Sequence, residues 1–548
     1  MKNTLLCILS LLLSLPLQAR MPKHEVRAVW LTTLNGLDWP RSRSAAVQKH
    51  ELCAVLDSFQ RAGINTVLLQ TRVRATTIFP SDIEPWYYVF TGRPGASPGY
   101  DPLQLAVDEC HRRGMELHAW VVALPVGKWN DPGCRELRRR QPSLLKKIGD
   151  EGFMNPEQPG VAPYLARFCA DIVRRYDVDG IHLDYIRYPD QWPRAHTAAE
   201  AARRRSRITA IVSAVSQAVK TAKPWVKMSC SPVGKYDDLL RYSSGGWNAR
   251  TAVGQDAQQW LRLGYMDQLY PMQYFRNNQF FPFAIDWQEN ACGRTIAAGL
   301  GIYFLDPSEG SWVLTDVTRQ MHVARQIGSG HCFFRSKFLL SDVKGIYRFT
   351  CQFNATPALT PPMTWMQRPA PLPPARLALR GNLLIWDEAE NRSDSPYLLY
   401  NIYASDTYPV DVTCAEHLVA THQARTTLRV PATPRRFYAV TACDRYGQES
   451  MPCQMKSPVS MEGQPWLVAD DIQRTDGRHL LLPLKPSTLE ADLIAVESLH
   501  GQTITLLPYD DEKAWIGHLP DGIYSLRAIG KKRVSHRLGY FSIRRKTP

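Results

Sequence analysis

The segment DGIHLDYIRYP, residues 179–189, combines the residue types and spacing best suited to chemistry. Successive side chains of a β-strand point to opposite faces, so Ile181 and Leu183 share one face. His182 and Asp184 share the other face, which we expect to point into the interior of a strand-based barrel. A carboxylate at the end of such a strand can act as a general acid, a general base or a nucleophile. Asp184 is therefore our first catalytic candidate.

Other polar side chains are expected at the same rim. His118 and Trp120 alternate along one preceding run, as Gln70, Arg72 and Arg74 do along another. Arg72 is predicted to hold either a ligand carboxylate or hydroxyl, or Asp184 itself. Arg187 is a second possible partner of Asp184, and a salt bridge between these two is the structural alternative to catalysis.

His118 and His182 are expected at similar depth on adjacent strands, as ligand contacts or as hydrogen-bonded core histidines. No third metal ligand stands at a telling spacing, so we expect neither a metal site nor a cofactor.

These residues need a scaffold that brings strand ends together. Short apolar runs alternate with longer amphipathic stretches between residues 25 and 355, as in a parallel βα sheet. Eight such units predict an α/β fold, a (β/α)8 TIM barrel with its active site at the carboxyl ends of the strands. The alternative is a doubly wound open sheet, but no glycine-rich phosphate loop follows the first run. The predicted strands are 26–33, 65–73, 116–124, 180–186, 227–232, 268–275, 296–304 and 330–337, and the clearest helices are 45–62, 102–113, 163–176 and 203–222.

The composition changes after the predicted barrel domain, which occupies residues 20–355. Residues 356–374 contain seven prolines and are predicted to form a stiff linker that leaves the barrel. Helical periodicity is absent beyond that point, and strand-like runs recur at the intervals found in β-sandwiches. We expect two small all-β sandwich-like domains, at 375–459 and 460–548.

The chain begins with the pattern of an exported protein. Lys2 precedes an apolar run that ends near Ala19, which is the form of a secretory signal peptide over residues 1–19. An uncleaved anchor is the alternative, but the run is short for a membrane span, so we expect no stable membrane anchor. The expected location is the periplasm or the outer surface.

The eleven cysteines after Cys7 include no CxxC pair and suggest buried thiols, although one disulfide among Cys414, Cys443 and Cys453 stays open.

The net charge of +15 favours anionic partners such as wall glycans, nucleic acid or lipid surfaces. Lysine and arginine are spread over all three predicted domains instead of forming one basic face, so we expect no nucleic-acid partner. The basic clusters at 135–147 and 203–207 are interpreted as the solvated faces of helices. Nothing in the sequence indicates the oligomeric state.

The barrel region resembles the glycosyl hydrolase-like 10 family, bacterial proteins that include a divisome-associated peptidoglycan glycosidase. The resemblance is carried by EVRAVWLTT at 25–33, NGLDWP at 35–40, IEPW at 83–86, PGYDPL at 98–103, RGMELHAW at 113–120 and the Asp184 segment. These stretches run in order from the first strand to the fourth. The resemblance implies a TIM barrel that cleaves bacterial wall glycan, possible preference for strands without stem peptides, and an accessory C-terminal region that is fibronectin type III-like in its first half.

Cleavage of a glycosidic bond usually needs two carboxyl groups, one to protonate the leaving oxygen and one to attack the sugar or activate water. We take Asp184 as one of them, with a preference for nucleophile or charge stabiliser. Glu84, which follows the second strand, is our candidate acid, and Asp38 and Asp306 compete with it. The further expected substrate contacts are Asn35, Asp38, Trp39, Trp86, Trp120, Tyr185, Arg187, Gln273 and Tyr274, together with Arg72, His118 and His182.

The function predicted from the sequence is an exported glycosidase that acts on a bacterial polysaccharide, most simply the glycan strands of peptidoglycan. The principal alternative is a non-catalytic glycan-binding protein that uses the barrel cleft and the sandwich domains, because fold alone does not fix function. A carboxylate pair within reach of one ligand would favour the enzyme.

Overall fold

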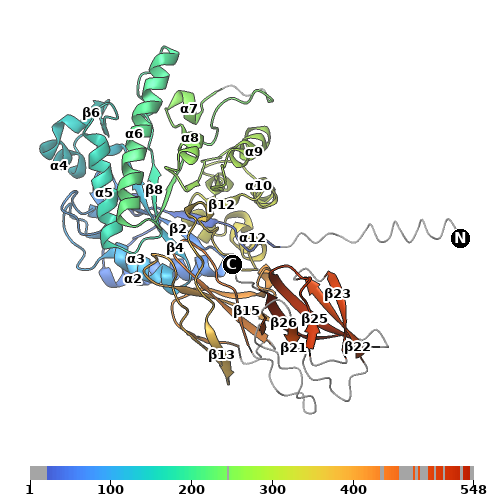
Figure 1. Cartoon of the computed structure of the whole chain (residues 1–548). Coiled ribbons are helices and arrows are strands. Elements are labelled where there is room, and N and C mark those ends of the chain that lie inside the picture. Colours follow the sequence, from blue (N-terminus) through green and yellow to red (C-terminus); the bar gives the residue numbers. More distant parts are fainter. Residues whose placement is uncertain are drawn as a thin grey trace.

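A computed structural model describes residues 21–242, 246–431, 437–455, 473–475, 479–481, 491–498, 502–509, 513–530 and 535–543. The predicted signal peptide lies outside these residues. Figure 1 shows the α/β region, from blue to yellow, and the β-rich C-terminal region in orange and red. Within the described residues, no helix is both long enough and apolar enough to cross a membrane.

Eight parallel strands form a closed barrel, which confirms the predicted TIM fold. Each strand pairs with the next in sequence order, and β1 pairs with both β2 and β12 to close the cylinder. Each of the eight predicted runs overlaps one observed strand. The strands are β1 (Arg27–Leu31), β2 (Thr66–Val73), β4 (Glu116–Val122), β8 (Gly180–Asp184), β9 (Lys227–Cys230), β10 (Gln268–Leu269), β11 (Thr295–Leu300) and β12 (Gly330–Phe333), and the short β3 (Thr76–Thr77) adds to β2.

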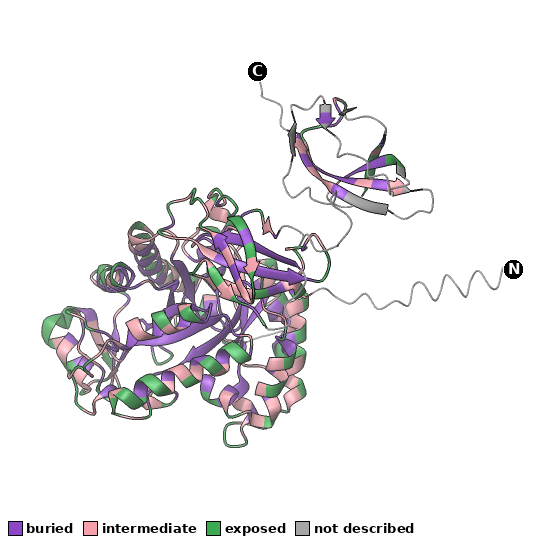
Figure 2. Ribbon diagram, turned by 90° about the horizontal axis from the view of Figure 1, so that it is seen from below, coloured by how far each residue is buried: buried purple, intermediate pink, exposed green. Residues whose placement is uncertain are grey.

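Helices surround the barrel, with their buried faces toward the strands and their exposed faces outward (Figure 2). Helix α3 begins where Asp101 accepts hydrogen bonds from the backbone of Leu103 and Gln104, and Pro102 occupies its first turn. The helices are α2 (Ala45–Arg61), α3 (Pro102–Arg112), α5 (Val161–Arg175), α6 (Ala198–Ala222), α7 (Ala249–Ala252), α8 (Ala257–Arg262), α9 (Phe281–Glu289), α10 (Leu314–Gln326), α11 (Ser336–Leu340) and α12 (Ile346–Phe353).

The barrel wall separates two apolar clusters. Ile181 and Leu183 belong to the large cluster between the strands and helices, as their alternation predicted. Trp30, His182 and Tyr270 meet edge to face inside the barrel, with ring centroids 5.2 to 6.2 Å apart. The interior is therefore filled by side chains, as in other barrels of this size.

An inserted sheet follows β4 at the mouth of the barrel. It contains β5 (Pro125–Lys128), β6 (Leu145–Ile148) and β7 (Glu151–Met154), with α4 (Pro132–Arg140) between β5 and β6. The basic cluster at 135–147 is thus helical only as far as Arg140 and continues into β6, so the expectation of one helix there was wrong in part. The insertion carries its own residues to the rim.

The proline-rich segment 356–374 packs against the barrel. Leu359 exchanges backbone hydrogen bonds with Glu25 and Lys23, and the Thr360 hydroxyl donates to Glu116 at 2.6 Å. The Trp365 indole donates to Asp267 at 3.0 Å. The segment therefore covers the amino ends of the barrel strands instead of leaving the barrel as a spacer.

Two β modules follow. The first, called the proximal module here, pairs the sheet β13 (Ala375–Arg380), β14 (Leu383–Asp387) and β17 (Thr427–Arg429) with the sheet β16 (Leu418–Gln423), β15 (Leu399–Ser405), β18 (Phe437–Cys443) and β19 (Cys453–Gln454). One apolar core is shared by both sheets, so this is a sandwich. Cys414, Cys443 and Cys453 are all free thiols.

The second module is also antiparallel for the most part. Its larger sheet has the order β20 (Gln473–Thr475), β26 (Ser535–Ile543), β25 (Gly522–Gly530), β22 (Ala491–Ser498) and β23 (Thr503–Pro508). Strands β21 (His479–Leu481) and β24 (Lys513–Trp515) form a smaller pair. A separate apolar cluster, which includes Ile494 and Phe541, supports this module.

Candidate active site

A cavity of about 560 Å³ opens at the carboxyl ends of the barrel strands. Residues from β2, β4 and β8, from the inserted sheet and from the loops after β10 and β12 line it. This is the end at which TIM-barrel enzymes carry their active sites. The cavity gathers five of the predicted residues, namely Trp120, Asp184, Tyr185, Arg187 and Tyr274.

Asp184 is fixed at the floor of this cavity by three donors. Its Oδ1 accepts from the Ser231 hydroxyl at 2.7 Å and from the Tyr185 backbone N–H at 2.8 Å. Its Oδ2 accepts from the Trp120 indole at 3.0 Å. The carboxyl group is thus oriented by neighbouring strands, and Oδ2 has one hydrogen-bond donor in the described chain where a carboxylate oxygen can accept two.

Burial dominates the electrostatics of Asp184, whose residue is only 5% exposed. Desolvation raises the pKa of this carboxyl above its ordinary value, and the Ser231 hydrogen bond and the Arg187 charge offset this only in part. A carboxyl group with a raised pKa holds its proton at higher pH, which suits proton donation.

Tyr185 follows Asp184 with a φ of +50°, a left-handed conformation that is costly for a residue with a side chain. This conformation turns the ring outward, where it is 42% exposed beside the cavity. Burial raises the pKa of the Tyr185 phenol; the carboxylates of Asp184, Asp190 and Glu151 add to the effect, and the Arg187 charge opposes it. Three carboxyl groups therefore lie within electrostatic reach of one hydroxyl.

Glu84 does not lie at the cavity, so the structure gives no support to our candidate acid. Both of its oxygens accept from Nε of Arg72, and Oε1 also accepts from the Tyr164 hydroxyl at 2.9 Å. Arg72 is fully buried; its Nη2 also donates to Glu84 at 2.6 Å, and its Nη1 donates to the carbonyls of Val122 and Ala123. Arg72 and Glu84 thus hold the barrel wall together, away from any substrate.

Four loop residues predicted to contact substrate also lie elsewhere. Asn35 accepts hydrogen bonds from Tyr87 and Tyr88, and Trp39 is buried with its indole bonded to the Gln48 carbonyl. Trp86 lines a smaller neighbouring cavity of about 300 Å³. Asp38 is buried against Arg335, which does line the main cavity, so Asp38 acts by holding that arginine.

The interior histidines and Gln273 do not line the cavity. His182 lies one layer below Asp184, where its Nε2 faces the Trp30 indole at 3.2 Å and its Nδ1 faces the Ser229 hydroxyl at 3.0 Å. His118 faces Glu116 at 3.1 Å near the opposite end of the barrel. Gln273 is buried as well. Within the described residues, no group of histidine, cysteine and acidic side chains could hold a metal ion.

The cavity also contains residues that sequence reasoning missed. Glu151 enters from β7 of the inserted sheet, and within the described chain it makes no ion pair. Asp190 lies at the rim, 54% exposed in its side chain and 3.7 Å from Nε of Arg187. Glu151 could have been found only as an acid in the long connection after the third barrel strand, since nothing in its local sequence marks it.

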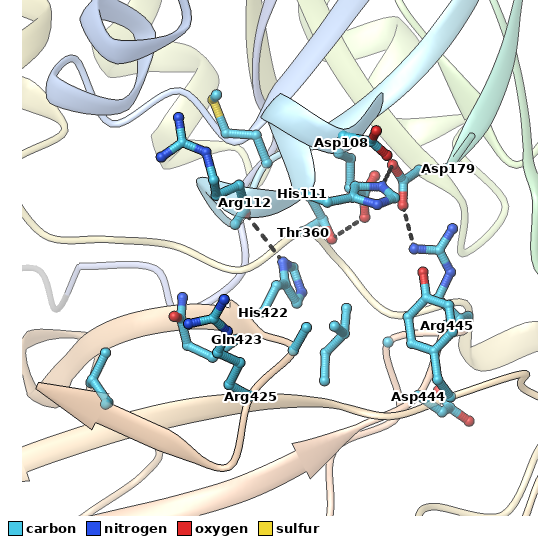
Figure 3. A pocket seen from close by; sticks show the side chains of 18 of the residues that line it. Asp108, His111, Arg112, Asp179, Thr360, His422, Gln423, Arg425, Asp444 and Arg445 are labelled. Atoms are coloured by element: carbon cyan, nitrogen blue, oxygen red, sulfur yellow. Dashed lines mark hydrogen bonds and ion pairs between the residues drawn. The ribbon is translucent and has the colours of Figure 1, made fainter. Parts of the chain in front are cut away.

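A second cavity of about 600 Å³ lies at the other end of the barrel, against the proximal module (Figure 3). There Asp179 accepts from His111 at 2.9 Å and pairs with Arg445 of the module at 2.8 Å. Glu116 pairs with Lys227 and accepts from Thr360. These buried acids are satisfied within the protein, and the amino ends of barrel strands serve stability, so we assign a docking role to this region.

The glycosyl hydrolase-like 10 family model matches residues 25–303, which run from the segment before β1 to just beyond β11. The chain belongs to this family. Family membership makes the protein a glycosidase, in agreement with the position and the chemistry of the Asp184 cavity. The matched region contains Asp184, Glu151 and most of the cavity wall.

This chain is similar to two named glycosyl hydrolases. It is 28% identical over 491 residues to the glycosyl hydrolase YngK of Bacillus subtilis, with 81% of this chain and 96% of YngK aligned. It is 32% identical over 297 residues to the glycosyl hydrolase DigH of Escherichia coli, with 47% and 68% aligned. Among solved structures, the PgaB (BpsB) glycoside hydrolase domain of Bordetella bronchiseptica aligns with a TM-score of 0.43 and 12% identity, covering 60% of this chain and 98% of that domain.

Proposed function

We propose that this glycosyl hydrolase-like 10 protein is exported and hydrolyses the glycan strands of peptidoglycan. The observation that carries the proposal is the Asp184 carboxyl group, buried and fixed by three donors at the floor of a cavity that Glu151 also lines. Export rests on the signal-peptide pattern of residues 1–19.

Asp184 is assigned as the general acid in this proposal, which revises our preference for a nucleophile. Desolvation raises its pKa and so favours the protonated form that an acid needs. Ser231 and Tyr185 occupy Oδ1, whereas Trp120 is the one donor to Oδ2 among the described residues. The proton is therefore carried on Oδ2 and passes to the glycosidic oxygen as the bond to the leaving sugar breaks.

Glu151 is assigned as the second carboxyl group. It lines the same cavity as Asp184, and it has no arginine or lysine partner in the described chain. A carboxylate without such a partner is available either to attack the sugar or to remove a proton from water. Asp190, the other acid at the rim, is more than half exposed and lies 3.7 Å from Nε of Arg187.

Peptidoglycan fits the net charge of the chain and the aromatic surface of the cavity. The whole chain carries +15, and removal of the predicted signal with Lys2 would leave +14, which favours an anionic polymer. Tyr185 and Tyr274, together with Phe334, supply aromatic surface of the kind on which sugar rings stack. The name of the relative DigH describes a hydrolase of glycosyl bonds, in keeping with this class of substrate.

The test is digestion of purified peptidoglycan, with and without its stem peptides, followed by mass spectrometry of the products. Wild type, Asp184→Asn and Glu151→Gln are compared at equal folded concentration. We expect shortened glycans from wild type, and a loss of about 100-fold or more in each variant. Binding of the polymer without products from wild type would instead establish a glycan-binding protein. Neither products nor binding would exclude peptidoglycan as the substrate.

A further inference from the structure

Arg187 has unused hydrogen-bonding capacity in the wall of the active-site cavity. Its residue is 5% exposed, and within the described chain neither Nε nor Nη1 has a hydrogen-bond partner. Buried guanidinium nitrogens without acceptors are costly, because the water that they lose is not replaced. Buried Arg72 shows the contrast, since its nitrogens are bonded to Glu84 and to backbone carbonyls.

The charge of Arg187 is also poorly balanced by the protein. Asp190 lies 3.7 Å from its Nε and is largely exposed, and ion pairs of this kind contribute little. Asp184 takes its hydrogen bonds from Ser231, Tyr185 and Trp120. Of the other two arginines of the cavity, Arg335 pairs with buried Asp38, whereas Arg74 has a side chain that is 35% exposed to solvent and lies 4.0 Å from Asp131.

Aromatic rings restrict how a ligand can approach Arg187. The guanidinium lies 4.5 Å from the centre of the Tyr185 ring and 5.2 Å from that of Trp247. Rings at these distances pack against the guanidinium group and limit access to it, and its N–H bonds all lie in the plane of the group. The ligand that fits these N–H bonds has two oxygen acceptors in one plane, as a carboxylate does.

We propose that Arg187 forms an anion-binding subsite, which holds a carboxylate carried by a sugar of the glycan chain next to the bond that is cut. The inference rests on the proposed glycosidase function and specifies its substrate as an acidic glycan. The incoming carboxylate displaces exposed Asp190 and completes the hydrogen bonding of the guanidinium. Sugars with this chemistry include muramic acid with a free lactyl group and the uronic acids. When the lactyl group is joined to a stem peptide, its carboxyl group is part of an amide and carries no charge.

The test compares glycan strands that carry free lactyl carboxylates with the same strands after carbodiimide coupling to methylamine. We expect wild type to lose about ten- to a hundredfold in kcat/KM on the neutralised strands, the value of a hydrogen bond to a charged group. Arg187→Gln should show that loss on the free strands and no further loss on neutralisation. Arg187→Lys keeps the charge but not the planar group with parallel N–H bonds, so its loss on neutralisation should lie between those of wild type and Arg187→Gln. The matched control is Arg112→Gln, an exposed arginine at the other end of the barrel.

The subsite is overturned if Arg187→Gln discriminates between the two strands as strongly as wild type does. Thermal unfolding of each variant establishes that it is folded. A binding experiment separates this result from failure of the proposed function. Asp184→Asn, with and without Arg187→Gln, is titrated with a tetrasaccharide of alternating N-acetylglucosamine and N-acetylmuramic acid, and with neutral chitotetraose. Tighter, Arg187-dependent binding of the acidic sugar supports the subsite even if no strand is cleaved, and equal affinities contradict it.

Discussion

Nε of Arg72 lies 3.0 and 2.9 Å from the two carboxylate oxygens of Glu84, and both side chains are buried in the barrel wall. The phenol of Tyr164 in α5 completes the arrangement by donating to Glu84 at 2.9 Å. Two residues that the sequence suggested as a substrate contact and a catalytic acid therefore satisfy each other.

Glu84→Gln should destabilise the fold without removing the chemistry. Loss of one partner leaves the Arg72 charge buried and uncompensated, which costs about 3 to 5 kcal/mol of the free energy of unfolding. Denaturant unfolding measures this loss, and activity per folded molecule should stay near the wild-type value. Glu136→Gln is the matched control, because Glu136 pairs with Arg139 and Arg140 on the surface and should matter by less than about 1 kcal/mol. A stable but inactive Glu84→Gln would restore Glu84 as the acid.

Asp184→Asn should reveal its role through the leaving group. A general acid contributes about 10²- to 10⁴-fold when the leaving oxygen is a sugar hydroxyl, and far less when it is an acidic phenol. We therefore expect a large loss on glycan strands and a small one on a dinitrophenyl glycoside, both measured as kcat/KM. Asp306→Asn, at another strand exit and outside the cavity, should leave both activities unchanged. Equal large losses on both substrates would assign Asp184 to the nucleophile or stabiliser role instead.

His111 should make the stability of the docked proximal module depend on pH. Burial lowers the pKa of this imidazole, but the Asp179 carboxylate outweighs burial and leaves the pKa above its ordinary value. A raised pKa means that the protonated form favours folding, so the contribution is complete below the unfolded value of about 6.5 and disappears as pH rises through the folded value.

His111→Gln should accordingly lower the free energy of unfolding by roughly 1 to 2 kcal/mol at about pH 5.5, and by less at about pH 9. Thermal unfolding at the two pH values measures this difference. The exposed His50, changed to glutamine, serves as control and should show no such pH-dependent difference. A His111→Gln deficit that grows with pH would contradict the assigned ion pair.

Gly114→Ala should disturb the contact between the barrel and the proximal module. A Cβ at Gly114 would lie 2.6 Å from the Thr421 carbonyl oxygen, and the backbone has a φ of +71°. Gly149 has a φ of +60° but open space around it, so Gly149→Ala isolates the cost of the conformation, about 1 to 2 kcal/mol. Gly114→Ala should cost about 1 to 3 kcal/mol more. Equal unfolding free energies for the two variants would show that the module is not held at this point.

Strand alternation predicted which side chains of β8 and β4 face the barrel interior, and its failures have physical causes. It placed Asp184 and His182 correctly on the inner face of β8, and Trp120 on that of β4. Along β2, however, the register against β4 shifts between Gln70 and Arg72. This bulge leaves Gln70 at the cavity and turns Arg72 toward Glu84 and the ring of Phe168 in α5. A single inserted residue in a ladder is not visible in hydrophobic periodicity.

Glu151 shows the other limit of sequence reasoning. It reaches the cavity because β5, β6 and β7 fold back as one antiparallel sheet over the barrel mouth, and that pairing is not encoded in the four residues of β7 alone. None of the quoted family motifs includes the inserted sheet, so they indicated the fold and Asp184 but not Glu151, the second carboxyl group of our proposal.

The docking of the proximal module beneath the barrel has a consequence for how it could assist catalysis. Strand β8 runs from the neighbourhood of Asp179, which meets the module, to Asp184 at the cavity floor, a span of roughly 15 Å through a packed interior. No described residue of the module is therefore within reach of Asp184. A module that grips the polymer would act as a tether, raising the local concentration of chain ends at the mouth. Its benefit would grow with polymer length and vanish for oligosaccharides too short to pass around the outside of the barrel.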